Sequence, residues 1–156
     1  MNWLINTGIV ILTFCLMEGV TWLTHKYVMH GFAWYFHADH HQPSQEQRLE
    51  RNDTFFLVFA LLSMAFFVCG TFVAGLGFMI YIGIGITLYG LAYFLVHDIF
   101  IHQRIHWLRH TDNFYFRALR KAHKMHHKHR GKEEGECFGM LWVPMKYFRE
   151  ALKTGR

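Results

Sequence analysis

Ten of the thirteen histidines in this chain fall into four short clusters, and the clusters form two matching pairs. The first pair is an HxxxxH motif followed by an HxxHH motif, and the second pair repeats both motifs later in the chain. Neutral imidazole is the commonest side-chain metal ligand. So many imidazoles in a repeated pattern are difficult to explain without metal, and they are too many for one ion. The candidate ligands are His25, His30, His37, His40, His41, His97, His102, His123, His126 and His127.

The size of this set favours a dinuclear redox centre, because two metals would receive five histidines each. Structural zinc prefers four ligands, commonly with cysteine, and the HExxH motif of zinc proteases is absent. Five imidazoles and one open position suit an octahedral redox metal better. Nitrogen ligands bind iron, copper, zinc and nickel, so the ligand type alone does not name the metal.

The two kinds of motif place their histidines differently on a helix. Residues at i, i+3 and i+4 share one face, so each HxxHH motif presents a single ligand face. Residues five apart lie about 140° apart around an ideal α-helix of 3.6 residues per turn. The pair His25 and His30 therefore requires a helix that frays or bends near Met29, or else two metals that take one histidine each. The sequence leaves both alternatives open.

The second HxxHH motif lies on a predicted helix from about Asn113 to His129, which Thr111 or Asp112 could cap. One face of this helix is apolar and then becomes the ligand face at the motif. The opposite face is basic and carries Arg117, Lys121, Lys124 and Lys128. Three histidines lie outside the repeat and are predicted not to be ligands: His106, His110 and His129.

Two long apolar runs predict a membrane protein. Residues 3–23 carry one charge and residues 55–96 carry none. Because about 20 helical residues cross a bilayer core, the second run must turn back, most simply at Ala74–Gly77. We therefore expect an all-α single domain over residues 1–156, an integral membrane bundle of about three to four transmembrane helices with a histidine-rich helical cap. The clear spans are near 3–23, 54–74 and 77–97, and close helix packing is expected at Gly83, Gly85 and Gly90.

The basic residues predict the orientation of these spans. All sixteen Lys and Arg lie at Lys26, Arg48, Arg51 or from Arg104 onwards, which three spans would place on one side of the membrane. The positive-inside rule assigns this side, which also carries the histidine clusters, to the cytoplasm. The N-terminal run lacks a basic n-region and a small-residue cleavage site, so it is expected to be a span rather than a signal peptide.

Three acidic residues adjoin the histidine pattern. Asp39 and Asp98 neighbour ligand histidines and are candidates for acceptors that fix imidazole tautomers. Glu18 is the only acid inside a span and lies seven residues before His25, on the same helical face. It either hydrogen-bonds a ligand or relays a proton, or it is an acid satisfied by a neighbouring helix.

The motifs resemble the fatty acid hydroxylase superfamily of histidine-rich membrane di-iron proteins, and within it the bacterial carotenoid hydroxylases. The resemblance runs from about Glu18 to Pro144 and includes HKYVMHG (25–31), HADHH (37–41), HDIFIHQR (97–104) and AHKMHHKHRGKEEGECFGML (122–141). His106 departs from it where a proline is expected, outside the ligand motifs. The resemblance implies that the ten histidines hold two irons, which use O2 to hydroxylate C3 of a β-ionone ring. β-Carotene would become β-cryptoxanthin and then zeaxanthin, at the cytoplasmic side of the bacterial inner membrane, with electrons from a ferredoxin-type donor.

Two other functions compete with this interpretation. A hydroxylase or desaturase of a fatty acyl chain or a sterol would use the same chemistry. A metal-binding transporter or sensor would not need so large a set of ligands, and three spans are few for a carrier. The basic helix face could steer an acidic electron donor or contact anionic lipid headgroups. No nucleic-acid partner is expected, and the sequence leaves the oligomeric state open.

Overall fold

The computed structural model describes residues 2–42, 49–106, 110–129, 131 and 133–153, and these residues form helices without any strand. The expectation of an all-α protein is confirmed. In chain order the helices are α1 (Trp3–Leu23), η1 (Thr24–Phe32), α2 (Trp34–His41), α3 (Asp53–Phe72), α4 (Met79–Tyr93), η2 (Phe94–Ile101), α5 (Phe114–His126) and α6 (Met145–Lys153), of which η1 and η2 are π-helices.

Three helical rods are long and apolar enough to cross a membrane: Trp3–Phe32, Asp53–Phe72 and Met79–Ile101. The second and third rods match the predicted spans to within a few residues, whereas the first continues through the nine residues of η1 beyond its predicted end at residue 23. α4 packs against both α1 and α3 and is the central helix of the three. Large apolar side chains such as Leu12 and Leu61 are more than half exposed on these rods. Such surfaces suit contact with acyl chains rather than water, so the chain is a membrane protein.

Glycines set how closely the spans approach one another. Gly75 turns the chain between α3 and α4 with φ of +84°, which confirms the predicted turn, because only glycine adopts this backbone conformation without strain. A Cβ built on Gly83 would lie 3.1 Å from Phe67, and one built on Gly85 would lie 2.6 Å from Thr13. The expectation of close packing is confirmed at these two positions. It is wrong for Gly90, where a Cβ would meet no atom within 4 Å.

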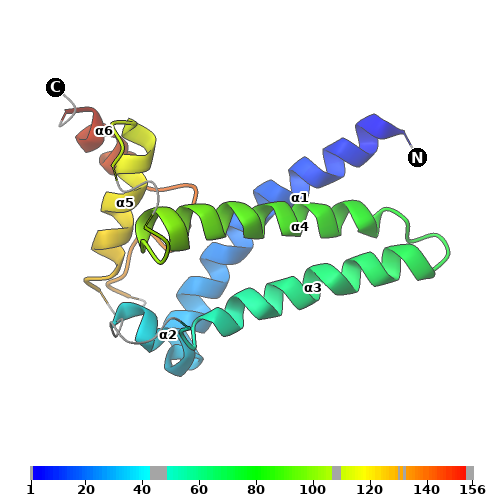
Figure 1. The fold of residues 1–156 in the computed structure, drawn as a ribbon, viewed down its shortest axis with the longest axis horizontal. Helices are drawn as coiled ribbons and strands as arrows, with labels where there is room; N and C mark the ends of the chain where they lie inside the picture. The colour runs from blue at the N-terminus through cyan, green and yellow to red at the C-terminus, as the bar shows by residue number, and fades with distance from the viewer. Residues whose placement is uncertain (1, 43–48, 107–109, 130, 132, 154–156) are drawn as a thin grey trace.

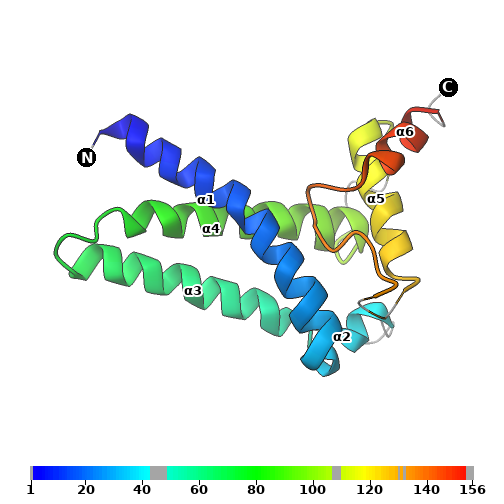
Figure 2. The ribbon, with the colours of Figure 1, turned by 180° about the vertical axis from the view of Figure 1, so that it is seen from behind.

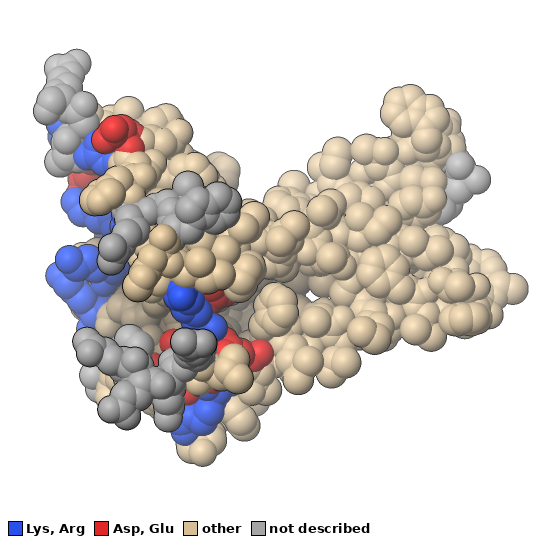
Figure 3. All heavy atoms as spheres, viewed as in Figure 1, with Lys and Arg blue, Asp and Glu red and all other residues tan. Residues whose placement is uncertain are grey.

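The two ends of the bundle differ in character. The beginning of α1 and the α3–α4 turn lie at one end, whereas α2, α5 and α6 lie at the other (Figure 1). In the face drawn in Figure 3, the described charged side chains gather at this second end. The extended segment before α6 passes between α5 and α1 (Figure 2). Helices and loops therefore form the expected cap over the ends of the spans that carry histidine. Five basic residues lie outside the described part of the chain: Arg48, Arg109, Arg130, Lys132 and Arg156.

The helix α5 differs from its predicted limits at both ends. Its N-cap is Asn113, whose Oδ1 accepts from the backbone N–H groups of Tyr115 and Phe116. The predicted cap at Thr111 or Asp112 is wrong, because the Thr111 hydroxyl instead accepts from the backbone N–H of Asn113. The helix ends at His126 rather than His129. It packs on α6, a helix that was not predicted, through the apolar cluster Ala118, Leu119, Ala122, Cys137, Val143, Tyr147 and Ala151.

Candidate metal centre

The predicted ligand histidines gather in two buried groups at the capped end of the bundle. One potential ligand nitrogen from each histidine of a group lies within 4.8 Å of those of the other members. His127 adjoins the second group, because its Nε2 lies 2.8 Å from Nε2 of His123. His106, His110 and His129 belong to neither group. The first group is His25, His30, His37, His41 and His126, and the second is His40, His97, His102 and His123.

The two repeats exchange one histidine each. In the first repeat, His40 turns to the second group, while the other four histidines stay in the first group. In the second repeat, His126 joins the first group, and the other four histidines lie in or beside the second group. The exchange follows from the HxxHH spacing, because the second histidine of each motif is rotated away from the outer two. Each motif therefore contributes to both groups.

The π-helices explain the HxxxxH spacing. His25 and His30 lie in η1 with ring centroids 5.1 Å apart, and the pair belongs to one group. At the end of η2 the backbone N–H of His102 donates to the carbonyl of His97 at 2.9 Å, a bond between residues five apart. This spacing brings residues i and i+5 to one face, which an α-helix does not do. The sequence left two alternatives for His25 and His30. The structure has the first: the helix departs from α-helical geometry, and both histidines belong to one group.

A kink near the end of η1 positions the next motif. Gly31 has φ of −113° and ψ of −125°, which are not helical values, and α2 begins three residues later at Trp34. The chain therefore reverses between His30 and His37, so that α2 returns its histidines to the end of η1. The Trp34 ring packs beside His30 and His41 with centroids 5.3 Å apart in both pairs, which shields these imidazoles from water.

Hydrogen-bond acceptors at Nδ1 fix the tautomers of the first group. Nδ1 of His25 donates to the carbonyl of Phe138 at 3.0 Å, and Nδ1 of His37 donates to Oδ1 of Asn52 at 2.7 Å. A neutral imidazole carries one N–H, so both rings have a bare Nε2. These two Nε2 atoms lie only 3.0 Å apart. Two lone pairs at this distance repel each other unless a cation lies beside them, and the geometry therefore fits a metal ion.

The second group shows the same arrangement. Nδ1 of His40 donates to Oε2 of Glu50 at 2.9 Å, which leaves Nε2 bare. Among the described residues, Nε2 of His40 and Nε2 of His97 have no hydrogen-bond partner although both are buried. Buried polar atoms are normally satisfied, and nitrogen lone pairs that converge in a closed site are typical of metal ligands. The residues of both groups therefore fit metal binding.

Burial keeps histidines of the first group neutral. It lowers the pKa of His37 to about 2, although the hydrogen bond to Asn52 opposes the shift. Burial also lowers the pKa of His126 to about 2, and the neighbouring His30 adds to this effect. Metal binding requires the neutral form of imidazole. At neutral pH these rings can therefore accept a metal without first releasing a proton.

Glu18 serves the fold rather than a histidine. Its carboxylate accepts from the backbone N–H groups of residues 140–142 at 2.8–3.1 Å and from the hydroxyl of Tyr89 at 2.6 Å. The prediction of a hydrogen bond to a ligand is wrong, and the alternative of an acid satisfied by neighbouring groups holds. Phe138, whose carbonyl accepts from Nδ1 of His25, lies two residues before the segment that Glu18 holds.

Asp39 and Asp98 occupy different places around the histidines. Oδ2 of Asp39 accepts from the backbone N–H and the guanidinium of Arg51, so the expected contact with a histidine is not found there. Oδ1 of Asp98 lies 3.4 Å from Nδ1 of His97, which agrees with the expected neighbour. Arg104 forms ion pairs with Asp98, Glu50 and Asp53. The sequence did not predict roles for Asn52, Glu50 and Arg104, because their spacing from the histidines follows no helical period.

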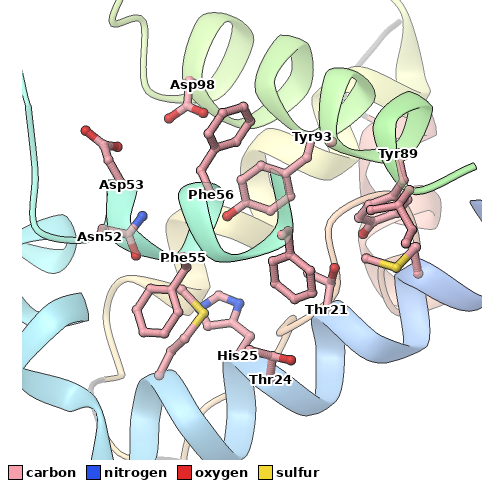
Figure 4. Close-up of a pocket in the computed structure, with 15 residues that line it drawn as sticks. Thr21, Thr24, His25, Asn52, Asp53, Phe55, Phe56, Tyr89, Tyr93 and Asp98 are labelled. Carbon is pink, nitrogen blue, oxygen red and sulfur yellow. The ribbon is translucent and has the colours of Figure 1, made fainter. Parts of the chain in front are cut away.

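An apolar pocket adjoins the first group of histidines. It lies between α1, α3 and α4, with His25 in its wall (Figure 4). Tyr93 lines the same pocket, and its ring packs on His97 with centroids 4.6 Å apart. Most of the remaining lining is aromatic or aliphatic, and the pocket lies at the depth of the membrane spans. An apolar molecule could therefore approach both histidine groups from within the bilayer.

Comparison with known proteins gives a family match over most of the chain. The sequence profile described as fatty acid hydroxylase matches residues 10–147. A beta-carotene hydroxylase of Pseudescherichia vulneris is 43% identical over 142 residues, which cover 90% of this chain and 78% of that protein. A beta-carotene hydroxylase of Pantoea ananas is 42% identical over 92% of this chain and 81% of that protein. A chloroplastic beta-carotene 3-hydroxylase of Gentiana lutea is 35% identical over 77% of this chain and 37% of that protein. No solved structure matches significantly.

Proposed function

The chain belongs to the fatty acid hydroxylase family, and from this premise we propose that it is a di-iron, O2-dependent hydroxylase of carotenoid end rings. The reaction is hydroxylation of C3 of a β-ionone ring, which converts β-carotene to β-cryptoxanthin and then to zeaxanthin. The single observation that carries the proposal is the pair of buried histidine groups beside an apolar pocket at membrane depth. The names of the relatives support the substrate class.

The ten histidines would hold two iron ions, one in each group, with His127 completing the second. When bound, reduced iron supplies activation of O2 for attack on an unactivated C–H bond. The chain supplies the rest. The acceptors at Nδ1 hold the imidazoles in the tautomer that leaves Nε2 bare, and the apolar pocket excludes water and positions the ring next to His25.

Electrons would come from a ferredoxin-type donor on the cytoplasmic side of the bacterial inner membrane. The outer face of α5 supports this docking site, because Lys124 and Lys121 are exposed there. Lys121 also forms an exposed ion pair of 2.7 Å with Glu150 on α6. The ligand histidines occupy the opposite, buried face of α5. A donor bound to the basic face would therefore approach the metals without displacing the ligand histidines.

The proposal is tested by combining product analysis with metal analysis. Expressed in a bacterium that accumulates β-carotene, the protein should yield hydroxylated carotenoid, and purified without oxygen it should hold two irons per chain. Zinc competes well at nitrogen sites, so restoration of activity by iron decides which metal is functional. Oxygenated fatty acyl or sterol products alone would favour the related lipid hydroxylases. A labile metal without any product would favour a transporter or sensor.

A further inference from the structure

Gly90 departs from the packing of the other glycines on α4. Gly83 and Gly85 lie against side chains of α3 and α1, and a Cβ at either position would be closer than 3.2 Å to them. A Cβ at Gly90 would meet nothing within 4 Å. Within the described part of the chain, Gly90 therefore faces open space rather than a helix. Close packing does not explain the glycine at this position.

Gly90 lies beside two neighbouring apolar hollows. One is the pocket that reaches His25 (Figure 4), and the other is a groove lined by α3, α4 and Phe94 at the start of η2. Gly90, Phe56 and Phe59 line both hollows. α3 and α4 lie close together at their turn and diverge towards the capped end (Figure 1). The shared lining places the groove next to the pocket that has His25 in its wall.

The chemistry of this groove suits a long apolar molecule. Its polar side chains are Ser63 and Thr87, whose hydroxyls lie 2.8 Å apart and both bond to the carbonyl of Gly83 at 2.9 Å. These hydroxyls are satisfied within the protein and offer little to a polar headgroup. Both helices are candidate spans, so the groove opens to the acyl chains of the bilayer. A linear polyene with a ring at its end has the required shape and polarity.

We propose that the polyene of the substrate crosses α4 at Gly90, in the groove between α3 and α4, while its end ring occupies the pocket beside His25. The missing side chain at Gly90 sets the width of this path, and Gly90 is therefore a specificity-determining residue. This inference rests on the proposed function as a carotenoid hydroxylase. It assigns no contact between Gly90 and the metals, so substitution at Gly90 should change substrate binding without changing metal content.

The test uses the series Gly90→Ala, Gly90→Val and Gly90→Leu in the full chain. Gly19→Leu is the matched control, because a Cβ at Gly19 on α1 also meets nothing within 4 Å and Gly19 lines neither hollow. Three quantities are measured: metal per chain, β-carotene retained by metal-free protein in detergent, and hydroxylated carotenoid formed per metal-loaded protein. We expect a graded loss that reaches about tenfold or more at leucine, because added side-chain volume overpacks a filled site. Metal content should be unchanged throughout, and the control should match the wild type.

The outcomes separate this inference from the proposed function. If β-carotene binding and hydroxylation stay flat across the Gly90 series, the path is wrong and the proposed function stands. If the wild-type protein forms no hydroxylated carotenoid, the proposed function fails and the occupant of the groove fails with it. Loss of metal from Gly90→Ala would also contradict the inference, because it would show that Gly90 packs against protein.

Discussion

Asn52 holds His37 in the tautomer that would bind a metal, through a hydrogen bond of 2.7 Å between buried side chains. Replacing it by leucine removes the acceptor while keeping similar volume. We expect Asn52→Leu to weaken metal binding about 10–100-fold, the usual effect of losing such an orienting partner. Asn52→Asp keeps an acceptor at the same place and should bind metal more tightly than the leucine variant. Competition with a chelator measures both affinities, and equal affinity in wild type and Asn52→Leu would contradict this role.

His126 and His129 test the assignment of ligands near the end of α5. His126 is fully buried in the first group, whereas His129 lies beyond the helix and outside both groups. His126→Ala should lose metal and hydroxylation, because it removes a ligand that no neighbour replaces. His129→Ala should keep most of both. Metal analysis and pigment chromatography decide the point, and the reverse result would show that the ligand positions on α5 are shifted.

The repeated spacing was sufficient to predict that the ten candidate histidines come together, and the structure gathers nine of them in two groups with His127 beside the second. It could not predict the acceptors behind them. Two of these acceptors are the backbone carbonyls of Glu136 and Phe138. Every residue has a backbone carbonyl, so the sequence does not indicate which one accepts a hydrogen bond. Asn52 and Glu50 lie before α3, and only the fold brings them to His37 and His40. The prediction failed for Glu18 because its partners lie 122–124 residues away on the backbone.

At the scale of elements, apolar length predicted the spans well, because the bilayer imposes it on any helix that crosses. The π-helices were not predicted, although the HxxxxH spacing showed that an ideal α-helix would fail. The structure resolves this with hydrogen bonds between residues five apart, as in the bond from His102 to His97. α6 was not predicted, although Tyr147 and Ala151, which it buries, lie four residues apart as on one face of a helix.

The basic face of α5 leads to a prediction about electron transfer. Reversing Arg117 and Lys124 to glutamate should leave iron content unchanged, because the ligand histidines lie on the buried face of the helix. If a donor docks there, its half-saturating concentration should rise and turnover should become less sensitive to salt, since electrostatic attraction no longer assists encounter. Lys153→Glu on α6 is the control for a charge reversal outside this face.

Reconstituted turnover against donor concentration at two ionic strengths provides the measurement for this face. Unchanged half-saturation and unchanged salt dependence would eliminate docking. Weakened membrane association with normal turnover would instead indicate that Arg117 and Lys124 contact anionic lipid headgroups. Loss of iron would show that the two faces of α5 are wrongly assigned.

At the scale of the whole molecule, the spans and the cap depend on each other. Glu18 in α1 accepts hydrogen bonds from the backbone of residues 140–142 in the cap. Because His40 lies in the second group and His126 in the first, each repeat contributes histidines to both groups. Neither half of the chain contains a complete group of ligands. These contacts support the prediction that residues 1–156 form a single domain, which calorimetric unfolding in detergent as one transition would test.

The same organisation predicts the orientation of the protein in the membrane. The Gly75 turn lies at the end opposite α5 and α6 (Figure 1), and residues 52–103 contain no Lys or Arg. Because basic segments are retained on the cytoplasmic side, reporters should show the Gly75 turn outside and residue 150 in the cytoplasm. Adding two lysines beside Gly75 should reduce this bias, whereas adding two glutamines should not. A cytoplasmic signal from the turn in the wild-type chain would contradict this orientation. It would place both histidine groups on the outer side of the membrane, where a cytoplasmic electron donor has no access to them.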